Sequence, residues 1–84
     1  MSIDLESINP DIVHDATGTY CPIPITELAK VMKTAKVGQI IELQADDEGA
    51  IQDVPAWCET TGNEYLGYID EDGLLRFFVR KTQE

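Results

Sequence analysis

Apolar residues at helical spacing mark the first half of the chain and predict an amphipathic helix there. Four of them fall at positions i, i+3, i+4 and i+7 and form one stripe: Leu28, Val31, Met32 and Ala35. The helix is predicted to begin between Pro22 and Pro24, because proline is tolerated in a first helical turn. Gly38 follows the stripe and is the predicted C-terminal cap.

A second apolar stripe predicts another helix near the middle of the chain. Its members are Ile51, Val54, Trp57 and Cys58. Pro55 interrupts this pattern, and proline fits a helix without penalty only in the first turn. The helix therefore either starts late, with Asp53 as its N-cap, or is kinked at the proline, and Gly62 closes it.

Alternation of apolar and polar residues predicts four strands, over residues 12–15, 39–45, 64–70 and 74–80. A hairpin-turn sequence at residues 70–73 joins the last two. The order β-α-β-α-β-β, with right-handed crossovers, predicts an α+β two-layer sandwich that has both helices on one face of the sheet. The other face is expected to be partly open. With 84 residues the chain is expected to be a single domain, residues 1–84, with residues 1–11 as a polar lead-in.

Charge narrows the classes of partner. Sixteen acidic against six basic residues give a net charge of −10. This balance argues against direct binding to nucleic acid or to anionic membranes, which needs a basic surface, and it favours basic partner proteins. No apolar stretch approaches the roughly 20 residues that span a bilayer, and the N-terminus lacks a signal pattern. A cytoplasmic protein is therefore expected.

The sharpest chemical feature is the sequence Cys21-Pro22-Ile23-Pro24, where a glycine-containing turn meets the predicted helix. The prolines stiffen the backbone and leave the N–H groups of Ile23 and Ile25 near the sulfur. The helix dipole stabilises a thiolate at this position and lowers its pKa by about one unit from the usual ~8.5. The alternative is a buried structural cysteine before a proline-initiated helix, and spacing alone does not separate the two.

The remaining candidates are weaker. His14 is interpreted as an ordinary strand residue rather than a catalytic base, and Cys58 as core packing rather than a resolving thiol. The two cysteines have the wrong spacing for a zinc ligand set, so no metal is expected. No cofactor is expected either, because a chain of this size holds one thin core without a deep cofactor cavity. The acidic run at residues 46–48 is predicted to cap the second helix, with a metal site as the minor alternative.

Two surface groups allow a docking role. Lys30, Lys33 and Lys36 are interpreted as a solvated helix face that has the further possibility of guiding an acidic partner. On the last strand, Leu75, Phe77 and Val79 are predicted to face one way and Leu74, Arg76, Phe78 and Arg80 the other. Of the latter, Arg76, Phe78 and Arg80 form either a docking patch on the open sheet face or simply a solvent-facing strand.

Taken together, these motifs resemble the TusA/SirA-like sulfur-carrier family over about residues 12–81. The matching features are Asp15-x-x-Gly18, Cys21-Pro22-Ile23-Pro24, Lys30, Gly38, Asp46-Asp47, Asp53-Val54-Pro55-x-Trp57-Cys58, Gly62 and Phe78-x-Arg80-Lys81. The paired motifs Cys-Pro-x-Pro and Asp-(Ile/Val)-Pro-x-Trp are specific together and weak alone. Thr19-Tyr20, Gly49 and Asn63 depart from residues that are common in the family, which bears on the identity of the partners.

The resemblance implies a mixed four-stranded sheet and a sulfurtransferase-type carrier. It implies that Cys21 accepts sulfane sulfur as a persulfide, supported by Asp15, Gly18, Pro22 and Pro24 as parts of the motif. The implied donor is a cysteine desulfurase or a rhodanese-like protein, and the implied acceptor is a DsrE-like carrier. The relay would feed tRNA thiolation, cofactor sulfuration or sulfur metabolism.

Two other functions stay open. A non-catalytic regulatory or adaptor module would bind partners through its acidic surface and the open sheet face. A thiol redox protein would form a reversible Cys21–Cys58 disulfide.

Overall fold

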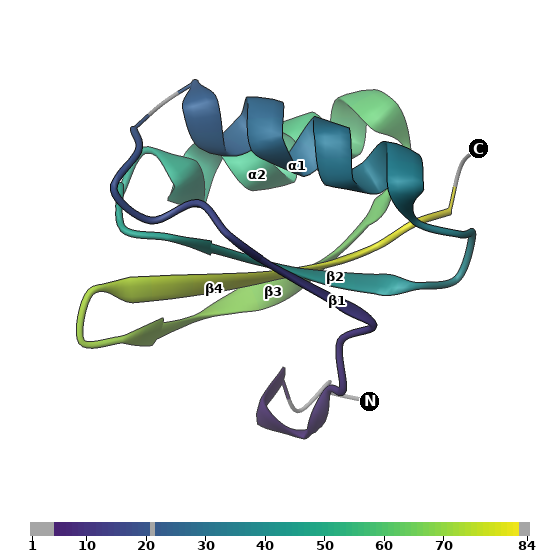
Figure 1. Cartoon of the computed structure of the whole chain (residues 1–84), viewed down its shortest axis with the longest axis horizontal. Helices are drawn as coiled ribbons and strands as arrows, with labels where there is room; N and C mark the ends of the chain where they lie inside the picture. Colours follow the sequence, from purple (N-terminus) through teal and green to yellow (C-terminus); the bar gives the residue numbers. More distant parts are fainter. Residues whose placement is uncertain (1–4, 21, 83–84) are drawn as a thin grey trace.

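The computed structural model describes residues 5–20 and 22–82, which form one mixed sheet with two helices on the same face (Figure 1). The elements are η1 (Leu5–Ser7), β1 (Ile12–Asp15), α1 (Ile23–Thr34), β2 (Ile40–Ala45), α2 (Ala50–Thr61), β3 (Glu64–Glu71) and β4 (Leu74–Arg80). The predicted order β-α-β-α-β-β and the two-layer arrangement are confirmed. Within the described ranges, no helix is long and apolar enough to cross a membrane.

The strand order is β1-β2-β4-β3. β1 pairs with β2 in parallel, while β4 lies between β2 and β3 and is antiparallel to both. A parallel pair needs a crossover, which α1 provides between β1 and β2. The carboxyl ends of β1 and β2 therefore meet at one edge of the sheet, and α1 and α2 both start from that edge (Figure 1).

The core lies between the helices and the sheet. The first helix buries Leu28 and Met32, as its apolar stripe predicted, and the second buries Val54 and Cys58. On β4 the inward-facing residues are Leu75, Phe77 and Val79, which confirms the predicted alternation. Cys58 is packed in this cluster as a free thiol, so its interpretation as core packing is confirmed. Its burial raises the pKa of the thiol to about 11.

The C-terminus of α1 is capped differently from the prediction. Ala35, in an extended conformation, is the C-cap, and Gly38 lies three residues further in the turn to β2, so the predicted glycine cap is wrong. The ammonium group of Lys81 donates hydrogen bonds to the carbonyl oxygens of Met32 and Ala35, each at 2.8 Å. These bonds satisfy carbonyls at the end of the helix, which removes the need for a glycine there.

The second helix runs through its proline. It begins at Ala50 after Gly49, so the late start at Asp53 is wrong and Pro55 is the sixth residue of the helix. A proline at this position has no N–H to donate to the carbonyl of Ile51. Packing of the apolar stripe against the core offsets that loss. Gly62, in the left-handed conformation, closes the helix as predicted.

The sheet face opposite the helices is more closed than expected. Phe78 is fully buried there, and η1, part of the predicted lead-in, lies against this face (Figure 1). Gly67 leaves room for Leu5, because a Cβ at residue 67 would come within 3.0 Å of its Cδ1 atom. Neither alternative predicted for the outward side of β4 holds for Phe78, which is neither an accessible docking residue nor solvent-facing.

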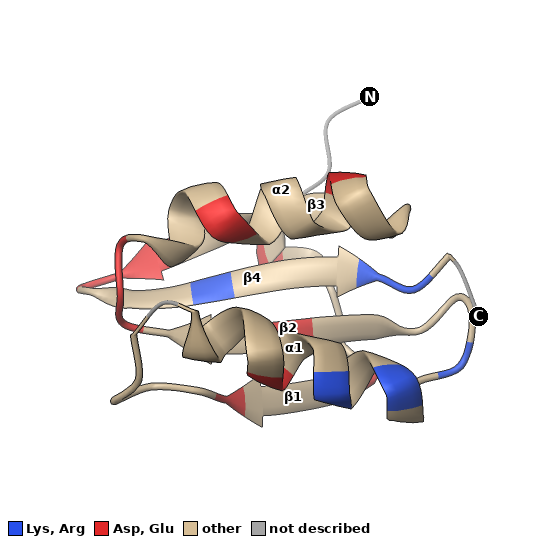
Figure 2. Ribbon diagram, turned by 90° about the horizontal axis from the view of Figure 1, so that it is seen from above, with Lys and Arg blue, Asp and Glu red and all other residues tan. Residues whose placement is uncertain are grey.

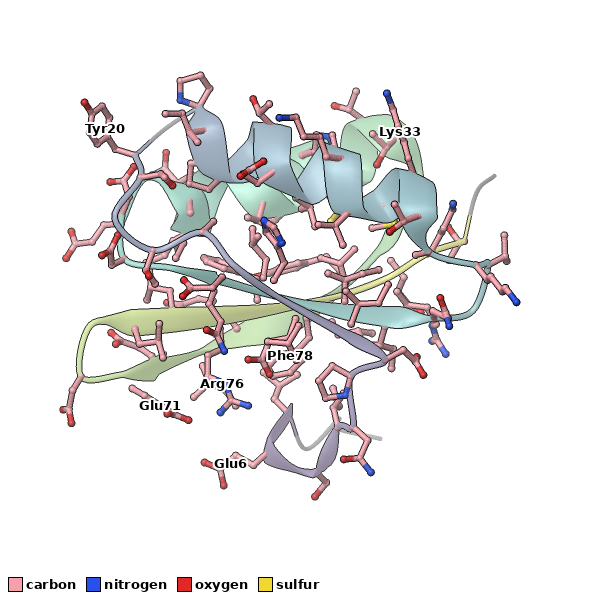
Figure 3. The ribbon with its side chains drawn as sticks, in the orientation of Figure 1. Glu6, Tyr20, Lys33, Glu71, Arg76 and Phe78 are labelled. Atoms are coloured by element: carbon pink, nitrogen blue, oxygen red, sulfur yellow. The ribbon has the colours of Figure 1, made fainter. Side chains whose placement is uncertain are left out.

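A buried ion pair lies beside Phe78. The carboxylate of Glu42, a residue only 3% exposed, accepts a hydrogen bond from the Arg76 guanidinium at 3.0 Å and one from the Gln44 amide at 2.7 Å. Burial by itself raises the pKa of Glu42, but these hydrogen bonds outweigh it and hold the pKa below its ordinary value of 4.5. Arg76 also pairs with Glu71, and Figure 3 labels both residues together with Phe78.

We expect the stabilising effect of Glu42 to depend on pH. Because its pKa is lowered in the folded state, its contribution is present above pH 4.5 and is lost as the pH falls through the folded-state pKa. Glu42→Gln should therefore lower the free energy of unfolding by about 1–3 kcal/mol at neutral pH, and by less in acid. Urea unfolding at several pH values measures this. Glu59→Gln, on the exposed side of α2, is the matched control, and a pH-independent deficit in Glu42→Gln would contradict the prediction.

We also expect Cys58 to resist alkylation in the native protein. Its sulfur is buried, and at mildly alkaline pH, well below about 11, almost none of it is thiolate. In a Cys21→Ser background, iodoacetamide should label the protein in denaturant and not in buffer, as read by intact mass. Cys21→Ser/Cys58→Ala shows the background. Equal labelling rates with and without denaturant would refute the protected position of Cys58.

Candidate functional site

The candidate site is the loop between β1 and α1, which carries the sequence position of Cys21. Cys21 itself lies outside the described residues, and its chain neighbours are exposed. Tyr20 is 71% and Ile23 42% exposed, and Pro22 is also exposed. Figure 3 shows Tyr20 pointing away from the body of the protein, close to the start of α1. Both sides of the Cys21 position are thus open to a partner.

The first support of this loop is Asp15, the last residue of β1. Its Oδ1 atom accepts hydrogen bonds from the backbone N–H of Thr17 at 2.8 Å and from the Thr17 hydroxyl at 2.6 Å. This is the side-chain turn that Asp forms with the residue two positions on. The hydrogen bonds stabilise the carboxylate and lower the pKa of Asp15. Asp15 therefore shapes the turn that follows β1.

The second support comes from the neighbouring strand. Gly18, in the left-handed conformation with φ of +79°, donates its backbone N–H to both carboxylate oxygens of Asp46, each at 3.1 Å. Asp46 directly follows β2, 28 positions further along the chain. The Asp46 carboxylate thus ties the loop before Cys21 to the end of the adjacent strand.

This contact corrects the prediction for the acidic run at residues 46–48. The N-cap of α2 is Gly49 and has no side-chain cap. Asp46 binds the β1–α1 loop, while the Oδ1 atom of Asp47 accepts from the Gly49 N–H at 3.3 Å. A usable signal was present in the sequence, since Gly18 and Asp46 each follow a strand, and parallel neighbours end at the same edge of a sheet.

The start of α1 is held by backbone hydrogen bonds. The N–H of Ile23 donates to the carbonyl of Tyr20 at 2.9 Å. The predicted nearness of this N–H group to the Cys21 sulfur concerns an atom outside the described residues. Thr26 donates its N–H and its hydroxyl to the Pro22 carbonyl, at 3.1 and 3.2 Å. Pro22 is the N-cap, and Pro24 is buried in the first turn. The two prolines therefore differ in role, one exposed at the tip and one anchored in the core.

Acidic side chains surround this end of the molecule. Figure 2 shows them in the β2–α2 loop and at the β3–β4 hairpin, where the strands and helices turn. Among them Asp46, Glu48, Asp70 and Asp72 are exposed. The hairpin turns through Asp72 and Gly73, both with positive φ, as the sequence predicted. The acidic surface that is predicted to favour basic partners therefore lies at this end of the molecule.

His14 lies on the helix side of β1. Its Nε2 atom is buried, has no hydrogen-bond partner among the described residues, and lies 3.8 Å from Oε1 of Glu27 on α1. This position, between a strand and a helix, fits the interpretation of His14 as a strand residue. No group of three or more potential metal-ligating residues occurs in the described part of the chain.

Comparison with known proteins identifies the family. The family model described as Sulfurtransferase TusA matches residues 12–81. YrkF and YrkI of Bacillus subtilis (strain 168), both provisionally named as sulfur carrier proteins, are 47% identical over 73 residues and 41% identical over 71. These matches cover 87% and 84% of this chain. They cover 95% of YrkI, whereas the chain spans only 40% of the length of YrkF.

Two further relatives support the assignment. The sulfur carrier protein TusA of Allochromatium vinosum is 34% identical over 68 residues, which are 81% of this chain and 90% of that protein. The crystal structure of a SirA-like protein from Desulfitobacterium hafniense has a TM-score of 0.74 at 23% identity, covering 86% of this chain and 99% of the other, and so shares the fold. With the family model matching most of its length, the chain belongs to the TusA sulfurtransferase family.

Proposed function

We propose that the chain is a sulfur carrier that holds sulfane sulfur as a persulfide on Cys21 and passes it to a partner protein. The Cys21 thiolate attacks the outer sulfur of a persulfide on the donor. A new S–S bond forms to Cys21 as the donor's S–S bond breaks, and the donor leaves as a thiolate. Delivery repeats this exchange with an acceptor thiolate as the attacking group, so no outside oxidant or reductant is needed.

The observation that carries the proposal is the exposure of the chain on both sides of the Cys21 position. A thiol that exchanges sulfur with two proteins in turn must be reachable by both. Tyr20 and Pro22 are exposed at the tip where the anchored loop meets α1. The positive end of the α1 dipole favours a thiolate or a persulfide anion next to it. Membership of the TusA family supports the same assignment.

The proposed partners follow from the family and from charge. The donor is a cysteine desulfurase or a rhodanese-like protein, and the acceptor is a DsrE-like carrier in a route to thiolated tRNA, a sulfur-containing cofactor or another sulfur metabolite. The exposed acidic residues Asp46, Glu48, Asp70 and Asp72 favour a basic surface on either partner. The alternative adaptor function loses part of its basis, since Phe78 is fully buried and not available on an open sheet face.

The test of this function is persulfide formation. Incubated with a cysteine desulfurase and cysteine, the protein should gain the mass of one sulfur atom, and a reducing thiol should remove it. Cys21→Ser should abolish the gain. Cys58→Ala should retain it, because the Cys58 sulfur is buried and its pKa is raised to about 11.

The outcomes separate the candidate functions. Absence of the mass gain in the wild-type protein with both desulfurase and rhodanese-type donors would refute the carrier function. Full complementation of a deletion strain by Cys21→Ser would favour the adaptor. A Cys21–Cys58 disulfide in non-reducing mass mapping would favour the redox protein.

We further expect Asp46 to act as a positioning residue for this exchange. Asp46→Asn weakens the two charge-assisted hydrogen bonds to the Gly18 N–H and should loosen the loop before Cys21. The rate of sulfur acceptance should fall about 3- to 30-fold, while the fold remains intact. Amide exchange at Gly18 should accelerate in parallel, which a change of surface charge alone would not produce.

Glu48→Gln is the matched control for Asp46→Asn. It removes the same charge two positions away, from an exposed side chain. It should leave Gly18 exchange unchanged and alter only the salt dependence of sulfur acceptance. Equal effects of the two variants on Gly18 exchange would overturn the positioning role.

A further inference from the structure

A cavity of about 400 Å³ lies between α1 and α2, towards their C-terminal ends. It is therefore at the opposite end of α1 from its first residue, Ile23. Ala29 and Met32 from α1 and Trp57 from α2 form its apolar wall. The volume falls within the range of small-molecule sites, which are mostly apolar with a few placed polar groups. The proposed sulfur exchange does not use this cavity.

Two lysines line the same cavity, Lys33 from α1 and Lys81 from the end of β4. Lys81 is only 9% exposed. Its ammonium group donates to the carbonyls of Met32 and Ala35, which accounts for two of its three N–H bonds. Lys33 is exposed, and Figure 3 shows it extending outward from the second half of α1. A buried and an exposed positive charge thus meet at one apolar opening.

Neither lysine has an acidic partner in the described ranges. The ion pairs there involve Lys30, Arg76 and Arg80. A buried ammonium without a counter-charge is unfavourable, and a bound anion would relieve it. This is notable in a chain with sixteen acidic residues and six basic ones, where carboxylates are plentiful.

The lysines of the chain gather at the end of the molecule where the cavity lies. All four lysines lie in or after the second half of α1 or directly after β4, while the exposed acidic loops lie at the other end (Figure 2). The Debye length at physiological salt is about 8 Å, so charges a molecule's length away are largely screened. The cavity therefore attracts anions locally although the whole chain is strongly negative.

We propose that this cavity binds a small organic acid, with its carboxylate between Lys33 and Lys81 and its apolar body against Trp57 and Met32. The other polar side chains of the wall are already satisfied. The Thr61 hydroxyl donates to the Trp57 carbonyl, and Asn63 bonds to Thr61 and to the N–H of Thr82. Recognition of the ligand therefore rests on the two ammonium groups and on the apolar wall.

Trp57 is the single tryptophan of the chain and reports directly on the cavity. Titration with 4-phenylbutyrate should change its fluorescence in a saturable way. The neutral 4-phenylbutanamide has the same body without the charge, and it should bind at least about five-fold more weakly. Equal binding of the two compounds, or no saturable signal up to millimolar acid, would overturn the proposal and leave Lys81 as a helix cap only.

Variants locate the site. Lys33→Gln should weaken phenylbutyrate binding about three- to five-fold and leave the amide unaffected. Lys36→Gln is the matched control, because it removes an exposed charge just beyond α1 and outside the cavity wall. Ala29→Phe fills the cavity and should abolish binding of both compounds. Thermal unfolding confirms that each variant is folded.

Equal weakening by Lys33→Gln and Lys36→Gln, or undiminished binding in a folded Ala29→Phe protein, would refute the assigned site. Persulfide formation on Cys21 should be the same in all three variants, so the result does not depend on the proposed sulfur exchange.

Discussion

The parallel pairing of β1 with β2 is the constraint on which the rest of the structure depends. Its register sets Ile12 opposite Ile41 and Asp15 opposite Gln44. Because the two strands run in the same direction, the chain must return over the sheet between them, and α1 makes that return. The same pairing brings the segments that follow both strands to one edge, where the candidate site is formed.

At this edge a short loop is held from two sides. Asp15 organises the turn from within, and Asp46 holds Gly18 from the neighbouring strand. The loop therefore ends at the Cys21 position with little freedom at its base, while Tyr20 remains exposed at its tip. A rigid base with an open tip suits a carrier, which must present one group to successive partners without enclosing it.

The closed far face and the segregated charges divide the remaining surface into regions. η1 lies against the face on which Phe78 is buried, and the Glu42–Arg76 pair occupies the same face with its charges satisfied. The acidic loops dominate the end near the candidate site, and the lysines lie towards the other (Figure 2). The two ends of the helical layer thus differ in where the lysines and the acidic loops gather, which fits the proposed sulfur exchange at one end and the proposed anion binding at the other.

The sequence by itself determined the elements and their order. Helical and alternating periodicities located both helices and all four strands, because burial of one face imposes its period on local composition. The Asp70–Gly73 turn was equally readable, since positive φ at two successive positions favours particular residues. The motif around Cys21 was also recognisable from the sequence, because its residues are contiguous in the chain.

Only the tertiary structure decided which distant groups meet. Three contacts join segments that are far apart in the sequence. Lys81, and not Gly38, caps the end of α1; Asp46 accepts a hydrogen bond from Gly18; and Leu5 packs against Gly67. Periodicity carries no information on such contacts, because it records that a residue is buried or polar and not what it touches. The course of α2 through Pro55 was undecidable for a related reason: the loss of one hydrogen bond is local, whereas the packing that offsets it comes from the whole core.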